Sequence, residues 1–231
     1  MEKYVEGIVL DALDYKDKSK IVHLYTPFGM DSVLAVHAAA LTSGKTAFAQ
    51  TFNEVEYLKS KAALPKLIEY RLQTSHYDFS SDLRLFPVLS VFLQVLKNLD
   101  PASPHHRIYP FFKSCLAAFE EKWNPFFVLA VFLVKMLAVF GVKPELRQCV
   151  VCKEEPIVSF SVLLGGALCP VHRIKEDTDS NTLSFFQKLY YFHAFEEDSF
   201  AVPQEFFSVI YRYYQEHVHL KLKDYRQPLV K

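Results

Sequence analysis

The sequence predicts an α+β protein of more than one domain, in which a small antiparallel β-barrel precedes an α-helical body with an inserted cysteine-containing module. Three observations lead to this fold class. Short segments of alternating apolar and polar residues fill the first 80 positions, apolar residues then recur at intervals of three and four, and two Cys-x-x-(Cys/His) pairs interrupt the helical pattern. Of the 231 residues 51% are hydrophobic, which is enough for a packed core.

Five strands are expected between Tyr4 and Asp78, because each segment is short and rich in β-branched or aromatic residues. The segments are YVEGIVLDAL, KIVHLYT, MDSVLAVHA, NEVEYLKS and KLIEYRLQTSHYD, and they are separated by breaks such as 14–19 and Pro27-Phe28-Gly29. Five short strands favour an OB-type β-barrel, and their spacing also fits an SH3-like barrel.

Helices are expected after residue 82. The segments are RLFPVLSVFLQVLKNLD, HRIYPFFKSCLAAFEEKW, NPFFVLAVFLVKMLAVFGV, NTLSFFQKLYYFHAF and PQEFFSVIYRYYQEHVHLKLK. Gly141 is expected to end the third of these, which is apolar on nearly all sides. Because Lys135 interrupts it and it is shorter than the roughly 20 residues of a bilayer crossing, we expect a buried helix. Cys115 is expected in the core, and His105-His106 as a solvated pair in a loop.

Four candidate metal ligands, Cys149, Cys152, Cys169 and His172, form two pairs on either side of Gly165-Gly166. Zinc takes four sulfur or imidazole ligands in a tetrahedron, and a two-residue spacing lets one tight turn aim both side chains of a pair at one point. The intervening IVSFSVLLGGAL is expected to form a β-hairpin with a Gly-Gly turn. Four protein ligands close the coordination shell, so we predict structural Zn²⁺; the alternative is a group of buried thiols.

Motifs for catalysis are missing from the sequence. A nucleic-acid deaminase would need His-x-Glu with Pro-Cys-x-x-Cys, a zinc protease His-Glu-x-x-His, and an α/β-hydrolase Gly-x-Ser-x-Gly, and none of these occurs. The run 43–46, Ser-Gly-Lys-Thr, imitates the end of a phosphate-binding loop, but Ala39 stands where that loop needs glycine. We therefore predict that the protein is not an enzyme and has no catalytic residue.

The net charge is zero, so any nucleic-acid surface must come from the distribution of charge. Residues 84–148 hold eight Lys and Arg against four Asp and Glu, whereas residues 1–83 hold nine against eleven. The first domain is nevertheless a candidate for a local basic face that binds DNA; the alternative is that its cations are ordinary solvated surface charges. Its candidate DNA-binding cations are Lys16, Lys18, Lys20, Lys45, Lys59, Lys61, Lys66 and Arg71. Tyr15, Tyr57 and Tyr70 are candidate base-stacking groups, although aromatic residues in strands are more often core.

Several segments carry a family resemblance. The opening GIVLDALDYKDKSKIVHLYTPFGM, the later QTFNEVEYLKSKAALPKLIEY, the pair VKPELRQCVVC and FSVLLGGALC, and the closing YYQEHVHLKLKDYR occur in order along nearly the whole chain. Together they resemble the bacterial recombination-mediator family RecO. The likeness implies an N-terminal OB domain, a helical body and a zinc module, in which Cys149, Cys152 and Cys169 match cysteine ligand positions. His172 stands where a fourth cysteine is usual, which zinc chemistry tolerates.

The resemblance implies a mediator of DNA repair and recombination that binds single- and double-stranded DNA, anneals complementary strands and helps RecA load onto single-stranded DNA with RecR. It also implies contact with the tail of single-stranded-DNA-binding protein, for which Arg84 and Arg107 are candidate residues. One departure concerns the segment after the third strand. The family commonly has a Lys/Arg-rich stretch there, and this chain has VHAAALTSGK, with His37 and Lys45 as its only candidate cations. We therefore expect weak, weakly salt-dependent DNA binding by the barrel.

Four segments are expected: an OB-fold barrel at 1–80, the first part of the helical domain at 81–148, a zinc-finger-like module at 149–176 and the rest of the helical domain at 177–231. The start MEKYVEGIVL resembles neither a secretory signal nor a transit peptide, so we expect reduced cysteines and a cytoplasmic, nucleoid-associated protein without a membrane partner. The alternative function is a zinc-stabilised protein-interaction module with little DNA affinity of its own.

Overall fold

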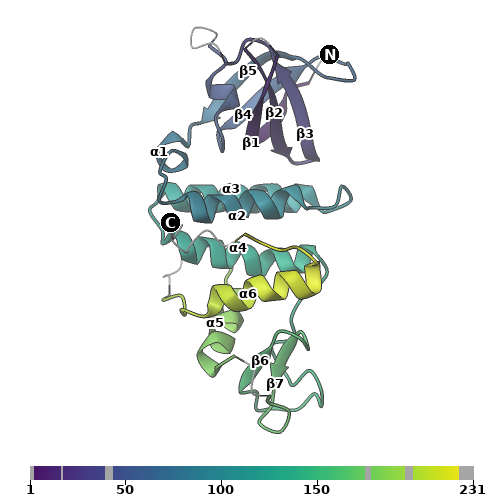
Figure 1. Cartoon of the computed structure of the whole chain (residues 1–231), viewed down its shortest axis with the longest axis vertical. Coiled ribbons are helices and arrows are strands. Elements are labelled where there is room, and N and C mark those ends of the chain that lie inside the picture. The colour runs from purple at the N-terminus through teal and green to yellow at the C-terminus, as the bar shows by residue number, and fades with distance from the viewer. Residues whose placement is uncertain (1–2, 17, 40–43, 175–177, 196–199, 224–231) are drawn as a thin grey trace. The chain divides into compact units, whose positions relative to one another are not determined.

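The computed structural model describes residues 3–16, 18–39, 44–174, 178–195 and 200–223. Its contacts divide the chain into two compact units, residues 1–121 and 122–231. The first unit contains a five-stranded sheet with helices, and the second contains helices with a small hairpin (Figure 1). This is the mixed α+β composition expected from the sequence.

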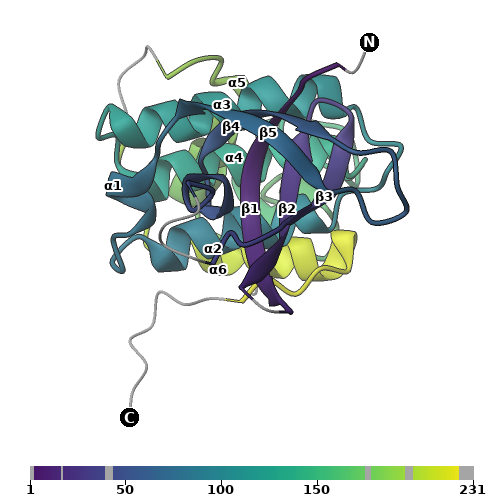
Figure 2. The same ribbon diagram turned by 90° about the horizontal axis from the view of Figure 1, so that it is seen from above.

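The sheet of the first unit is antiparallel, with strand order β3-β2-β1-β4-β5. Its strands are β1 (Val5–Tyr15), β2 (Ser19–Thr26), β3 (Gly29–Ala35), β4 (Glu54–Lys59) and β5 (Leu67–Thr74). Figure 2 shows β1, β2 and β3 side by side. All five predicted strands are confirmed. The last one was expected to reach Asp78, but it ends at Thr74, and a short helix α1 (Tyr77–Ser80) follows it.

Alternation along the strands creates the core of the sheet. Val22 and Leu24 of β2 are fully buried, as are Val9 of β1 and Val33 of β3. These residues pack with Phe48, which lies in the connection between β3 and β4. A period of two places every second side chain on the same face, so the pattern that predicted strands also selects the core.

A closed barrel is not confirmed. The edge strands β3 and β5 are joined in this structure by an isolated parallel bridge between Leu34 and Lys66, where the Leu34 N–H donates to the Pro65 carbonyl at 2.8 Å. Each other pair of neighbouring strands forms a full antiparallel ladder. No ladder therefore closes the sheet between β3 and β5 among the described residues, and the OB-type barrel stays a prediction.

Two helices complete the first unit, α2 (Phe86–Lys97) and α3 (His105–Glu120). Tyr25 of β2 packs against Tyr109 and Phe112 of α3, with ring centroids 6.1 and 6.3 Å apart. The expectation that His105-His106 is a solvated loop pair is wrong about the loop for both residues, which belong to α3, and wrong about solvation for His105, whereas His106 is exposed. His105 is the first residue of α3, is buried, and its Nδ1 lies 3.1 Å from the Tyr25 hydroxyl oxygen. Cys115, on the same helix, is fully buried as predicted.

The second unit is built around α4 (Pro125–Val139), the predicted apolar helix, most of whose residues are buried. The Asn124 side chain accepts hydrogen bonds from the N–H groups of Phe126 and Phe127 and so starts the helix. Gly141, with φ +74°, follows its end as predicted. No helix in the described part of the chain has the length and apolar character that a membrane crossing requires.

Two further helices follow, α5 (Ser180–Tyr191) and α6 (Phe206–Tyr213), and α6 continues into a π-helical turn, η2 (Tyr214–Val218). Both are shorter than the periodicity predicted. The helical segment formed by α6 and η2 ends because His219 adopts a left-handed conformation with φ +60°. The Asp179 carboxylate begins α5 by accepting a hydrogen bond from the Thr182 N–H.

The predicted hairpin is present as β6 (Ser159–Ser161) and β7 (Gly166–Leu168). Gly165, with φ +72°, lies in the turn, whereas Gly166 is already the first residue of β7, so the expected two-residue Gly-Gly turn is wrong. A Cβ atom on Gly166 would lie 2.7 Å from the Glu145 carbonyl oxygen, so a side chain there would displace the segment before the cysteines. Phe160 of β6 stacks on Phe186 of α5 at 4.8 Å.

Candidate functional site

The four predicted metal ligands come together at the base of the hairpin in the second unit. The Sγ atoms of Cys149, Cys152 and Cys169 and a ring nitrogen of His172 all lie within 4.8 Å of one another. Cys149 and Cys169 are buried, and Cys152 and His172 are half-buried. This Cys3His group is a candidate metal-binding site.

Short distances link these four side chains. Cys152 Sγ lies 3.8 Å from Cys169 Sγ. His172 Nδ1 lies 3.6 Å from Cys149 Sγ and 3.3 Å from Cys169 Sγ. All four donor atoms therefore surround one common point, and a soft or borderline cation prefers such a sulfur and imidazole donor set.

Two tight turns aim the ligands. After Cys149 the chain reverses, so that the Lys153 N–H donates to the Cys149 carbonyl at 2.9 Å, with Lys153 at φ +66°. After Cys169 the N–H groups of His172 and Arg173 both donate to the Cys169 carbonyl, at 3.1 and 3.0 Å. Each turn brings the two ligands of its pair, which are three positions apart, to the same side of the backbone, as their spacing predicted.

The electrostatics of the cluster favour ionised sulfur at Cys149 and Cys169, whose pKa values are lowered, and oppose it at Cys152, whose pKa is raised. Desolvation opposes ionisation of the Cys149 thiol, but hydrogen bonds from the backbone of Cys152, Cys169 and Val151 outweigh it and lower its pKa to about 6. The Cys169 sulfur accepts a hydrogen bond from the His172 ring, and this raises the pKa of His172. Thiolates are the form of cysteine that binds metal, so backbone hydrogen bonds prepare Cys149 and Cys169 for a cation.

Most of the predicted DNA-binding cations lie on the sheet or its loops, and several are already paired. Lys59 donates to both carboxylate oxygens of Asp31 at 2.5 Å, and Lys20 donates to Asp14 at 2.7 Å. Arg71 is exposed over the Tyr4 ring, 4.6 Å from its centroid. The remaining cations are exposed or half-buried: Lys16, Lys18, Lys45, Lys61 and Lys66. Of the segment VHAAALTSGK, residues 40–43 lie outside the described residues.

The three candidate stacking tyrosines differ in access. Tyr57 is fully buried and its hydroxyl donates to Asp31 at 2.5 Å, so its predicted role as a base-stacking group is wrong. Tyr70 is half-buried against Phe48, at 5.2 Å between ring centroids. Tyr15 is half-buried as well, with the Lys16 ammonium 5.5 Å from its ring. A strand residue on the core face is unavailable to a ligand, and Tyr57 lies on that face.

The two predicted partner-binding arginines also differ. Arg84 forms a bidentate pair with Asp82, through Nε and Nη2 at 2.7 to 3.1 Å. Arg107 is exposed on the first turn of α3. Arg84 therefore has its charge balanced by a neighbour in its own loop, whereas Arg107 presents its charge to solvent.

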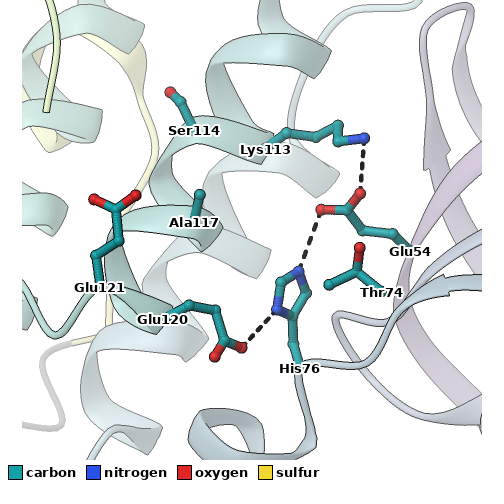
Figure 3. A pocket seen from close by; sticks show the side chains of 8 residues that line it. All are labelled: Glu54, Thr74, His76, Lys113, Ser114, Ala117, Glu120 and Glu121. Atoms are coloured by element: carbon teal, nitrogen blue, oxygen red, sulfur yellow. Dashed lines mark hydrogen bonds and ion pairs between the residues drawn. The ribbon is translucent and has the colours of Figure 1, made fainter.

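A second group of charged side chains, which the sequence did not reveal, lines a pocket in the first unit (Figure 3). The pocket has a volume of about 480 Å³. His76, only 2% exposed, lies between two carboxylates: Nδ1 is 2.8 Å from Glu120 and Nε2 is 3.2 Å from Glu54. Lys113 donates to the other oxygen of Glu54 at 2.7 Å. We call Glu54, His76, Lys113 and Glu120 the His76 network.

Opposing effects set the protonation of this network. Burial opposes a charge on His76, but the hydrogen bonds with Glu54 and Glu120 outweigh it and raise its pKa. For Glu54 burial also opposes the charge, and His76 and Lys113 outweigh it, so its pKa is lowered. The network therefore favours a protonated imidazole between two carboxylates. It joins β4, the loop after β5 and α3, which are separated along the chain, and no spacing rule could have linked its members.

Two family models match consecutive parts of the chain, and several curated proteins are similar to most of it. The family model described as Recombination protein O N terminal matches residues 1–75, and the one described as Recombination protein O C terminal matches residues 81–226. The chain is similar to the DNA repair protein RecO of Halalkalibacterium halodurans, with 26% identity over 96% of this chain and 92% of the relative. It is similar to the protein of the same name from Bacillus subtilis, with 28% identity over 96% and 91%. For that from Bacillus pumilus the identity is 32% over 71% and 66%.

Proposed function

The chain belongs to the RecO family and so has a role in DNA repair and recombination, and we propose that it acts as a mediator without covalent chemistry. It binds single- and double-stranded DNA, anneals complementary strands and, with RecR, helps RecA load onto single-stranded DNA at the nucleoid. The observation that carries this proposal is the match of two consecutive family models over nearly the whole chain. Electrostatic contacts with the DNA phosphates and stacking of aromatic side chains on the bases are sufficient for such a role, because annealing makes and breaks base pairs but no covalent bonds.

The sheet of the first unit is proposed to be an OB-type barrel that contributes cations to DNA binding. Lys16, Lys18, Lys61 and Lys66 support this, because all four are exposed and the structure gives none of them an ion pair with another described residue. Lys20 and Lys59 are weaker candidates, since a carboxylate already neutralises each. The sheet therefore offers fewer free cations than the sequence indicated.

The Cys3His site is proposed to hold structural Zn²⁺. Around a tetrahedral zinc ion with Zn–S of about 2.3 Å and Zn–N of about 2.0 Å, neighbouring sulfur atoms lie about 3.8 Å apart and sulfur and nitrogen about 3.5 Å apart. Three of the six distances between donor atoms, 3.8, 3.6 and 3.3 Å, are close to these values, and all the donor atoms lie within 4.8 Å of one another. When bound, the ion would connect the two turns and leave no coordination position for a substrate, so its contribution is stability.

RecR and the acidic, hydrophobic-ended tail of single-stranded-DNA-binding protein are the proposed protein partners. Of the two arginines considered for the tail, Arg107 is the better candidate, because Asp82 already occupies Arg84. A second candidate function is an interaction module with little DNA affinity. The ion pairs of Lys20 and Lys59 and the net charge of zero favour it.

An annealing assay separates the two functions. Complementary oligonucleotides are coated with single-stranded-DNA-binding protein, and the rate of duplex formation is measured with and without the full chain at low and moderate salt. A mediator accelerates annealing, and more strongly at low salt because phosphate contacts release counterions. If the chain binds the coating protein but leaves the annealing rate unchanged at every salt concentration, the interaction module is the correct function.

A further inference from the structure

We call the Cys3His site with its hairpin β6–β7 the metal module. A pocket in the second unit lies beside this module and combines cations with tyrosines. Its volume is about 310 Å³, at the lower end of the range of about 300 to 1,000 Å³ for small-ligand sites. The segment that precedes Cys149 supplies Lys143, Glu145 and Arg147, and the end of α5 supplies Tyr190 and Tyr191. None of the residues that the sequence suggested for DNA binding belongs to this pocket.

The Arg147 guanidinium is held in place without losing its charge. Its Nε donates to the Tyr191 hydroxyl at 2.9 Å, and its central carbon lies 5.8 Å from the Tyr191 ring centroid. The two terminal nitrogens of Arg147 have no hydrogen-bond partner among the residues that the structure describes. A guanidinium fixed in this way loses little further conformational freedom when it binds a phosphate.

The charge of the pocket is positive. Lys143 is exposed and has no ion pair within the described parts of the chain. Glu145 is the acidic residue that lines the pocket, and its carboxylate accepts hydrogen bonds from the Arg147 backbone N–H at 2.9 Å and the Gln148 side chain at 3.5 Å. The negative end of α5 is countered by Lys135, which donates to the Tyr190 carbonyl at 2.7 Å.

The metal module holds this segment in position. The Glu145 N–H donates to the Gly165 carbonyl at 3.1 Å, and the Ala167 N–H donates to the Glu145 carbonyl at 2.7 Å. On the other side, the Gln187 side chain of α5 donates to the Leu146 carbonyl at 2.8 Å. The segment 145–147 is thus fixed between the hairpin of the metal module and α5.

We propose that this pocket binds one nucleotide of single-stranded DNA, and that the metal module serves to position it. Lys143 and Arg147 contact the phosphodiester, and the base stacks on the Arg147 guanidinium or on the ring of Tyr191, which is 48% exposed. A phosphate next to an aromatic base matches a pair of cations next to an exposed ring. The proposal rests on the DNA-binding function proposed above and assigns part of it to the second unit.

Binding of the full chain to a fluorescently labelled oligothymidine, followed by anisotropy at several salt concentrations, tests the assignment. Arg147→Ala and Tyr191→Ala are each expected to weaken binding about fivefold or more at low salt. Arg147→Ala should also reduce the slope of log affinity against log salt by about 0.7, the contribution of one phosphate of a single strand. Tyr191→Phe keeps the ring but removes the acceptor of the Arg147 Nε hydrogen bond, so it should weaken binding less than Tyr191→Ala.

The matched control is Arg212→Ala, which removes an exposed positive charge from α6 in the same unit and should leave affinity nearly unchanged. Gly166→Ala removes no pocket side chain but should displace Glu145, and is expected to weaken DNA binding as well. A photoreactive oligonucleotide should crosslink to Tyr191 in the unaltered protein.

The outcomes distinguish the two proposals. If the unaltered chain binds oligothymidine and Arg147→Ala binds equally well, the pocket assignment is wrong and the DNA-binding function stands. If the unaltered chain binds no DNA, both fail together. If Arg147→Ala loses binding only to an acidic peptide probe, the pocket takes a protein ligand instead of a nucleotide.

Discussion

The Cys3His cluster of the second unit and the His76 network of the first unit both connect separate backbone segments through ionisable side chains. They differ in how far apart their members lie along the chain. The cluster draws its ligands from positions 149 to 172, in two turns of one local module, whereas the network joins residues from position 54 to position 120. Each group places at least one buried ionisable side chain among partners, and only the first group leaves a recognisable pattern in the sequence.

This difference explains why a sequence motif reveals the Cys3His cluster and not the His76 network. Two cysteines three positions apart can meet at one point in any tight turn, so their spacing alone limits the geometry. Glu54 and His76 meet only because β4 and the loop after β5 are neighbours in a folded sheet, and Glu120 joins them only because α3 packs nearby (Figure 3). A local cluster is therefore expected to respond to its metal, and a distant network to the packing of the whole unit.

Loss of the metal ligand Cys149 should have the largest effect. Cys149→Ser removes a buried thiolate donor, and because metal binding is coupled to local folding it should lower the stability of the second unit by more than about 3 kcal/mol. Metal analysis and thermal unfolding measure the change. The control Cys115→Ala removes a buried thiol elsewhere and should keep the full metal content; equal metal loss in both variants would contradict the assignment.

Breaking the His76 network should have the next largest effect. Glu54→Ala leaves His76 buried with one carboxylate partner fewer and removes the partner of Lys113, so the free energy of unfolding should fall by about 2 kcal/mol or more. Urea denaturation gives this value. Glu56→Ala, on the same strand but outside the network, is the matched control, and an equally large loss there would show that the network contributes nothing special.

The network should also make stability depend on pH, with a defined sign. The pKa of His76 is raised in the folded protein, so its stabilisation is complete below the pKa of an unfolded histidine, about 6.5, and is lost as pH rises through the raised value. The difference in unfolding free energy between the unaltered protein and His76→Gln should therefore shrink from pH 6 to pH 9. A difference that stays constant across this range would mean that His76 is not protonated.

The smallest effect is expected for the ion pair between Arg84 and Asp82. Arg84→Ala removes this bidentate pair, but the Arg84 side chain is 89% exposed and the Asp82 carboxylate keeps its hydrogen bond from the backbone N–H of residue 84, so the melting temperature should not change measurably. Annealing of DNA coated with single-stranded-DNA-binding protein should be equally unaffected, because the pair is confined to its own loop. A clear loss of annealing would restore Arg84 as a partner-binding residue.

From the sequence alone, the local features were predictable. Alternation gave five strands, and three- and four-residue periodicity gave the helices, with errors mainly at their ends, such as β5 ending at Thr74 and α6 at Tyr213. The spacing of the four ligands predicted their convergence. Each of these features depends on residues within one turn, hairpin or helix, where backbone geometry leaves few alternatives.

Tertiary packing alone decided which side chains meet across the fold. It buried Tyr57 and His105, paired Lys59 with Asp31, and assembled the His76 network and the pocket around Arg147. Whether a lysine is free to bind phosphate depends on the neighbour that folding brings to it, and that neighbour can come from any distance along the chain. Contacts of this kind have no period and no spacing, so they become visible only when the elements have packed.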